Sequence, residues 1–235
     1  MDEADTYTQA AFGQDIKAMN IMYRLPPVSF SELPLRMALF SATMVDELNE
    51  FDTFVHINGR MRDVSNPATR NTKLVGQWDT GFVLVDIMDW LGDICVYCAS
   101  ELVKIHDKYI FECFRALNDG PSNSPEAVTV SQTYTILQAC QQSLRQRLYK
   151  TIGTTKLLKV SEELLAMMEA THRTCEIFGI GLTPILQIIM ESNKSKLGAD
   201  GQPIYDGNGK FLKGPNYWKP EPKIRALLKE RGLID

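Results

Sequence analysis

The chain contains few of the features from which disulfide-rich or membrane proteins are built. Only five of its 235 residues are cysteine, an odd number without the spacing of a disulfide framework. Together with an amino terminus that shows no signal-peptide pattern, this predicts a reducing, cytoplasmic compartment. Every long apolar run is interrupted by charge well before the ~20 residues that a bilayer span requires, so no membrane segment is expected.

An excess of basic residues is also missing. The chain has 25 Lys and Arg against 29 Asp and Glu, a net charge of -4, and a pI near 5.5. A general nucleic-acid-binding surface needs a basic excess to displace counterions, so no nucleic-acid partner is expected. Because 44% of the residues are hydrophobic, the chain can bury a sizeable core, and we expect a single domain over residues 1–235.

Helical periodicity is present over most of the chain. Apolar residues recur at helical spacing in several segments, whereas turn formers dominate the connections between them. The pattern predicts an all-α helical bundle with an irregular, lysine-rich C-terminal segment. The segments expected to be helical are 12–23, 35–54, one that begins at Phe82, 126–149, 161–178, 184–190 and 222–231.

Two of the expected helices carry acidic pairs. Glu47 and Glu50 lie three residues apart, and Asp89 and Asp93 lie four apart with Asp86 on the same flank. Residues at these spacings share a helix face, so packing of the two helices would bring the carboxylates together. At about 4 Å and an effective dielectric of roughly 20, each like-charged pair costs on the order of 4 kcal/mol. Protonation or a cation must relieve this repulsion, and an oxygen-only set favours magnesium or manganese.

The C-terminal segment combines lysine with glycine. Asn193, Lys194, Lys196, Lys210 and Lys213 stand among five glycines. Lysine supplies a mobile positive charge, and glycine lets the backbone approach a ligand closely. This composition suits contact with phosphate oxygens, and a solvated turn is the alternative interpretation.

Two further patterns indicate structure more than chemistry. Cys95 and Cys98 have CxxC spacing inside an expected helix, but no second pair completes a zinc site, so we interpret them as buried thiols. Glu169 and His172 have the spacing that di-iron bundles use, although such sites need a second pair. A structural role is expected for His172, with a di-iron bundle as the alternative.

Five segments together resemble one known superfamily. They are Asp46–Glu50 (DELNE), Asp89–Tyr97 (DWLGDICVY), Glu191–Lys196 (ESNKSK), Asp206–Lys210 (DGNGK) and Leu212–Tyr217 (LKGPNY). In this order they are similar to the all-α nucleotide pyrophosphohydrolases, which include MazG and phosphoribosyl-ATP pyrophosphohydrolase-like proteins. The fold that this resemblance implies is the helical bundle of that superfamily.

The resemblance also implies an activity. Members hydrolyse a nucleoside triphosphate between the α and β phosphates to a monophosphate and pyrophosphate, and they generally form homo-oligomers, here a dimer or tetramer. Mg²⁺ is the implied cofactor, with Mn²⁺ as a possible substitute. The implied metal ligands are Glu47, Glu50, Asp89 and Asp93, with Glu47 and Glu50 also catalytic, and the implied nucleotide contacts are Asn193, Lys196, Lys210 and Lys213.

Several alternatives stay open at this point. Asp86 would join or replace Asp89 as a ligand. Residues 109–178 look like a helical insertion relative to compact members, and would cap the site, build a subunit interface or replace a helix from a partner. A function of another class is also open, in which the chain is a non-catalytic nucleotide-sensing or interaction protein on the same scaffold.

Overall fold

The computed structural model describes residues 9–25, 27–51, 56–57, 60–61, 80–105, 130–207 and 211–234. Within these residues the chain is mostly helical, which confirms the all-α class predicted from the periodicity. The long connection expected at 58–81 lies largely outside the described residues. The α-helices are α1 (Gln9–Met22), α2 (Leu33–Glu50), α3 (Thr80–Ile105), α5 (Val130–Thr151), α6 (Leu157–Ile177), α7 (Leu182–Lys194) and α8 (Glu221–Glu230), and a short 3-10 helix, η1 (Phe30–Glu32), precedes α2.

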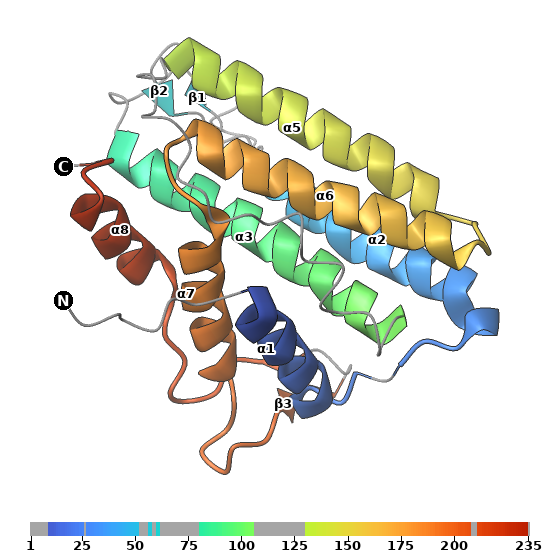
Figure 1. Cartoon of the computed structure of the whole chain (residues 1–235). Helices are drawn as coiled ribbons and strands as arrows, with labels where there is room; N and C mark the ends of the chain where they lie inside the picture. The colour runs from blue at the N-terminus through green and yellow to red at the C-terminus, as the bar shows by residue number, and fades with distance from the viewer. Residues whose placement is uncertain are drawn as a thin grey trace.

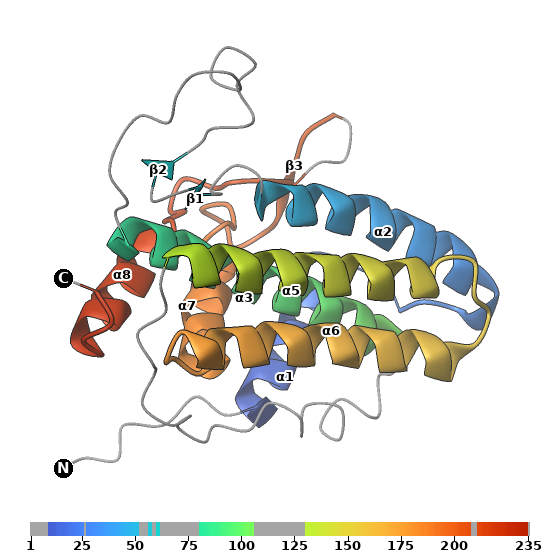
Figure 2. The same ribbon diagram turned by 90° about the horizontal axis from the view of Figure 1, so that it is seen from above.

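Four long helices form the body of the molecule. α3 packs on α2 and α6, and α5 packs on the same two helices from the other side. Figures 1 and 2 show these four helices running lengthwise side by side. α1, α7 and α8 pack across the remaining side of α3. α3 is therefore the central helix, and its long apolar run reflects burial on nearly every side.

The core follows the predicted stripes. Met37, Phe40, Met44 and Leu48 of α2 are buried, as predicted for its inner face. α5 and α6 belong to the segment that looks inserted in sequence, yet Leu144 and Leu164, among others, are buried in the common core. These two helices thus complete the bundle instead of forming an appendage to it.

Several helices begin or end away from the predicted positions, with α2 and α6 among them. α2 ends at Glu50, four residues earlier than expected. α6 begins at Leu157 instead of Ser161, because the Ser161 hydroxyl donates to the Leu157 carbonyl (3.0 Å) from inside the helix and does not cap it.

α7 is longer than predicted. It runs from Leu182 to Lys194, and Pro184 lies in its first turn, where a proline removes no intrahelical hydrogen bond. The turns before and after α6 were predicted correctly, because Gly153 (φ 73°) and Gly179 (φ 83°) both adopt the left-handed conformation that favours glycine.

The C-terminal segment forms a small hairpin and a final helix. β3 (Ile204–Tyr205) pairs antiparallel with β4 (Phe211–Leu212), and a second two-residue pair joins β1 (His56–Ile57) to β2 (Arg60–Met61). Within the described ranges, no single helix has the length and apolar composition needed to cross a membrane, and only α6 and α7 taken together, bent by 114°, meet that test.

Candidate functional site

The C-terminal end of α2 is fixed against its neighbours by hydrogen bonds to its last carbonyls. The indole Nε1 of Trp90, on α3, donates to the carbonyl of Glu47 (3.0 Å). The side chain of Gln141, on α5, donates to the carbonyl of Leu48 (2.7 Å). The last carbonyls of a helix have no partner within it, so these side chains replace that partner. The two acidic helices are therefore joined next to their carboxylates.

The four predicted carboxylates come from α2 and α3, and repulsion from other members of the set contributes to the raised pKa of Glu47, Asp89 and Asp93. Burial raises the pKa of Glu47 to about 9, with further contributions from Asp93, Glu50 and Asp89 and an opposing one from Lys196. Burial raises the pKa of Asp89 to about 8, with added repulsion from Asp93 and Glu50. Burial also raises the pKa of Asp93 to about 6 and that of Glu50 to a smaller extent. All four shifts reflect removal of a charge from water, and those of Glu47, Asp89 and Asp93 also reflect the proximity of like charges.

Three carboxylate oxygens in this cluster are buried without a hydrogen-bond donor. They are Oε1 of Glu47, Oδ1 of Asp89 and Oε2 of Glu221. Glu47 as a whole is only 8% exposed. Buried polar atoms are normally satisfied, and an unpaired carboxylate oxygen is the most costly kind to leave so. Among the residues that the structure describes, no donor reaches these three oxygens.

Asp86 and Asp89 differ in their surroundings. Beyond burial, Asp93, Glu221, Glu50 and Asp86 raise the pKa of Asp89, whereas the pKa of Asp86, about 6, is raised by Glu221 of α8 and lowered by Arg225 of the same helix. Asp89 thus shares the space between α2 and α3, and Asp86 lies on the side of α8. This arrangement favours Asp89 over Asp86 as a partner of the two glutamates.

Positive charge reaches the cluster from the turn after α7. The pKa of Lys196 is lowered by burial, while Asp93, Asp89 and Glu47 act to raise it. Its ammonium donates to Oδ1 of Asn193 (2.6 Å). This hydrogen bond joins two of the predicted nucleotide contacts, Lys196 and Asn193. Lys196 is therefore a resident counterion of these carboxylates.

The other predicted lysines are placed differently. Lys213 lies over the ring of Tyr217, 4.5 Å from its centroid, and Lys196 is 5.9 Å from the same centroid, so both cations lie near this ring. Lys194 instead pairs with Asp15 of α1 (2.7 Å). Lys210 lies outside the described residues.

The segment that carries these lysines is held closely to α7. The amide of Gly214 donates to the carbonyl of Lys196 (2.8 Å), and the Ser192 hydroxyl donates to the carbonyl of Trp218 (2.8 Å). The backbone approaches so closely at Gly214 that an added Cβ would lie 1.9 Å from the Leu197 carbonyl oxygen. Only glycine fits this position.

We expect Gly214→Ala to destabilise the protein by about 3 kcal/mol, because two backbone segments would have to separate. For a chain of this size that corresponds to a fall in Tm of roughly 6–12 °C. Thermal unfolding measures the change. Gly207→Ala is the matched control, because a Cβ there meets nothing within 4 Å, and its Tm should stay within about 2 °C of wild type. Equal effects of the two substitutions would contradict the close contact at Gly214.

The donor set of the cluster fits a hard cation. All of its candidate ligand atoms are carboxylate oxygens, and two of the predicted ligands, Glu47 and Asp89, have buried oxygens without a donor. In the side-chain positions of the described residues, no group of three or more His, Cys, Asp or Glu is already arranged as a metal site. The ligands would therefore have to adjust their side-chain positions to close around an ion.

The CxxC pair and His172 both lie in the helical core. Cys95 and Cys98 are fully buried free thiols, as predicted. His172 is 4% exposed, and its Nε2 lies 3.5 Å from Oε1 of Glu176 in the next turn of α6. Its nearest charged partner is therefore outside the carboxylate cluster, and nothing in this arrangement favours the di-iron alternative.

Two members of the site were not recognised in the sequence. Glu221, in the first turn of α8, raises the pKa of Asp86, Asp89 and Asp93. Acidic residues are common in first turns of helices, so the sequence offers no signal for this role. The pKa of Tyr97 is raised by burial and by Glu47, Asp93 and Glu50. Its position four residues after Asp93, on the same face, is a signal that could have identified it.

Comparisons with known proteins give no further assignment. No family model matches the chain, and no curated protein and no solved structure matches it significantly.

Proposed function

We propose that this protein is a magnesium-dependent nucleotide pyrophosphohydrolase that cleaves a nucleoside or deoxynucleoside triphosphate between the α and β phosphates. The observation that carries the proposal is Oε1 of Glu47, a buried carboxylate oxygen without a donor beside three further carboxylates. Such an arrangement is costly in a protein without a function for it. Glu47, Glu50, Asp89 and Asp93 would hold the ion, with Mn²⁺ as a possible substitute.

The lysines support a polyphosphate substrate. Lys196 and Lys213 both lie near Tyr217, and Lys196 also interacts with the carboxylate cluster, so a ligand there would meet negative charge from the carboxylates and positive charge from the lysines. A triphosphate with its bound cation needs both kinds of charge, because the carboxylates can bind the cation and the lysines can bind the phosphate oxygens. The Asn193 side chain, which accepts from Lys196, would keep the ammonium oriented toward phosphate oxygens.

The chemistry follows from these positions. When bound, magnesium supplies neutralisation of the phosphate charge. Glu50, more exposed than Glu47, would accept a proton from a water molecule as the oxygen of that water attacks the α-phosphorus. The bond between this phosphorus and the bridging oxygen then breaks, and pyrophosphate leaves with its added charge stabilised by Lys196 and Lys213. The products are a nucleoside monophosphate and pyrophosphate.

The test is hydrolysis of a panel of ribo- and deoxynucleoside triphosphates with Mg²⁺ or Mn²⁺, with the products identified. We expect at least one nucleotide to yield monophosphate and pyrophosphate in equal amounts. Glu50→Gln should lower kcat by about 100-fold, because a positioned general base contributes 10²–10⁴. Glu162→Gln, an exposed glutamate on α6, is the matched control and should retain full activity.

Two results would contradict the proposal. One is the absence of hydrolysis of every nucleotide with either ion, and the other is orthophosphate as the released product. Nucleotide binding by calorimetry without turnover would instead support the non-catalytic, nucleotide-sensing alternative on the same scaffold.

A further inference from the structure

The C-terminal end of α7 is held at two successive residues by side chains from α1 and the turn that follows it. The phenol hydroxyl of Tyr23 donates to the backbone carbonyl of Asn193 (2.5 Å), and the ammonium of Lys194 pairs with the carboxylate of Asp15 (2.7 Å). Figure 1 shows α1 and α7 side by side, and the two helices are in contact. The turn that carries Lys196 therefore begins at a helix end whose position is fixed by α1.

Asn193 connects Tyr23 to Lys196. The carbonyl that accepts from the Tyr23 hydroxyl also accepts from the amide of Lys196 (3.1 Å), and Oδ1 of the same asparagine accepts from the Lys196 ammonium (2.6 Å). Asn193 is 7% exposed, so water has little access to these hydrogen bonds. Lys196 thus depends on Asn193 for the position of its backbone and of its charged group.

The ring of Tyr23 is held by the β3–β4 hairpin. Its centroid lies 4.4 Å from that of Phe211, and the hydroxyl of Tyr205 donates to the carbonyl of Tyr23 (2.6 Å). Burial, followed by the effect of Tyr205, raises the pKa of the Tyr23 phenol. The hydroxyl therefore keeps its proton at neutral pH and remains a hydrogen-bond donor to α7.

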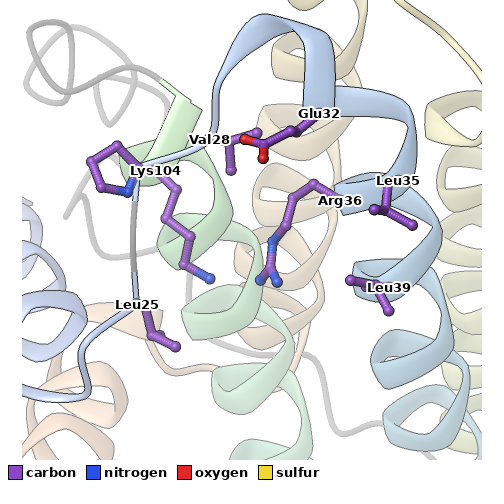
Figure 3. Close-up of a pocket in the computed structure, with 8 residues that line it drawn as sticks. Leu25, Val28, Glu32, Leu35, Arg36, Leu39 and Lys104 are labelled. Atoms are coloured by element: carbon purple, nitrogen blue, oxygen red, sulfur yellow. The ribbon is translucent and has the colours of Figure 1, made fainter.

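The backbone around Tyr23 is fixed to α3. The side-chain amide of Asn20 donates to the carbonyl of Ser100 (3.0 Å), and the Ser100 hydroxyl donates to Oδ1 of Asn20 (2.7 Å). Figure 3 shows Leu25 and Lys104 of α3 among the side chains that line a cavity of about 200 Å³. A hydroxyl on a segment that is anchored on both sides can fix the position of a neighbouring group, because it cannot easily move with that group.

We propose that Tyr23 is a positioning residue of the candidate site, which holds Lys196 through Asn193 so that the ammonium faces the phosphate oxygens of a bound ligand. This inference rests on the proposed function, because that function places Lys196 at the leaving pyrophosphate. The Tyr23 hydroxyl acts through Asn193 and not on the substrate. A misplacement of about 1 Å can cost roughly 100-fold in rate, so a hydrogen bond that fixes the cation indirectly has a measurable effect.

Tyr205 provides a matched control for Tyr23. Its hydroxyl also donates to a backbone carbonyl, but that carbonyl belongs to Tyr23 and not to α7. Replacement of either tyrosine by phenylalanine removes one hydrogen bond of the same kind from the same aromatic cluster. Only Tyr23→Phe removes the bond to Asn193.

The test is a double-mutant cycle on the full chain, with the nucleotide that the wild type hydrolyses best. Tyr23→Phe should lower kcat/KM about tenfold when Lys196 is present, and less than about twofold in the Lys196→Met background. A loss of folded protein would lower the rate equally in both backgrounds, so the cycle separates positioning from a purely structural role. Tyr205→Phe should stay within about twofold of the wild type. Equal losses in the two backgrounds, or a Tyr23→Phe variant as active as Tyr205→Phe, would overturn the positioning role.

A second measurement distinguishes failure of this inference from failure of the proposed function. If the wild type hydrolyses no nucleotide, the proposed function fails, and the same variants are compared by calorimetry for binding of inorganic pyrophosphate with Mn²⁺. Tyr23→Phe should then raise the Kd about tenfold with Lys196 present and less than about twofold with Lys196→Met. A wild type that does not bind pyrophosphate, or a Tyr23→Phe variant that binds it as tightly as the wild type, would overturn the positioning role as well.

Discussion

Glu47→Gln is expected to abolish activity and at the same time to stabilise the metal-free protein. Hydrolysis of the preferred nucleotide should fall by about 10³-fold in kcat/KM, or about 4 kcal/mol of transition-state stabilisation, because the substitution removes a predicted metal ligand. The gain in stability comes from the raised pKa of Glu47, about 9. At pH 8, folding of the wild type requires that Glu47 either takes up a proton or is buried with its charge. A glutamine at this position is neutral and requires neither.

The size of this gain depends on pH. Each pKa unit corresponds to about 1.4 kcal/mol, and the neighbouring carboxylates relax in part, so we expect about 2 kcal/mol at pH 8. That corresponds to a rise in Tm of roughly 4–8 °C. At pH 5 the unfolded chain also begins to protonate its glutamates, and the gain should be close to zero. Thermal unfolding of both proteins in EDTA at the two pH values measures it. A lower Tm of the variant at pH 8 would show that Glu47 is well solvated or well paired.

The metal-free wild type should lose stability as the pH rises from 5 to 8, and a divalent cation should restore it. The pKa values of Glu47, Asp89 and Asp93 are about 9, 8 and 6, all above those of the unfolded chain. Between pH 5 and pH 8 the folded protein therefore binds more protons than the unfolded one. Stability contributed by these groups is present at low pH and is lost as the pH approaches their folded values.

We expect the free energy of unfolding to fall by at least about 3 kcal/mol over this interval in EDTA. Saturating Mn²⁺ at pH 8, at about 100 times its Kd, should recover about 2.7 kcal/mol, and the same addition at pH 5 should recover much less. Potassium chloride of equal ionic strength is the control that separates specific binding from screening. A stability that is flat or rising with pH in EDTA, or equal protection by potassium, would exclude a strained carboxylate cluster.

The periodic part of the molecule was accessible from the sequence. The stripe of Met37, Phe40, Met44 and Leu48 predicts the inner face of α2, and that face is buried. The acidic pairs could be assigned to a common region because helical spacing fixes the direction in which side chains point. The joining of α2 to α3 through Trp90 and the Glu47 carbonyl was not predictable, because it depends on where two distant helices cross.

Non-local features account for what the sequence analysis missed. Glu221 reaches the cluster only because α8 docks on α3, and no local pattern encodes that docking. The role of α5 and α6 in the core was also not predictable. The sequence comparison shows only that these helices lie in a segment that looks inserted, and it does not show where they pack.

The position of Lys196 has a consequence for the carboxylates near it. Its ammonium is tethered to the chain one turn beyond α7, so its local concentration around the carboxylates does not depend on the salt in the medium. Lys196 thus acts as a counterion built into the chain. It reduces the repulsion between the carboxylates of α2 and α3 before any ligand binds. When a cation bound with its triphosphate, the cation would replace Lys196 as the partner of the carboxylates. The ammonium of Lys196 would then be available to the phosphate oxygens, so the same charge would have one partner without ligand and another with it.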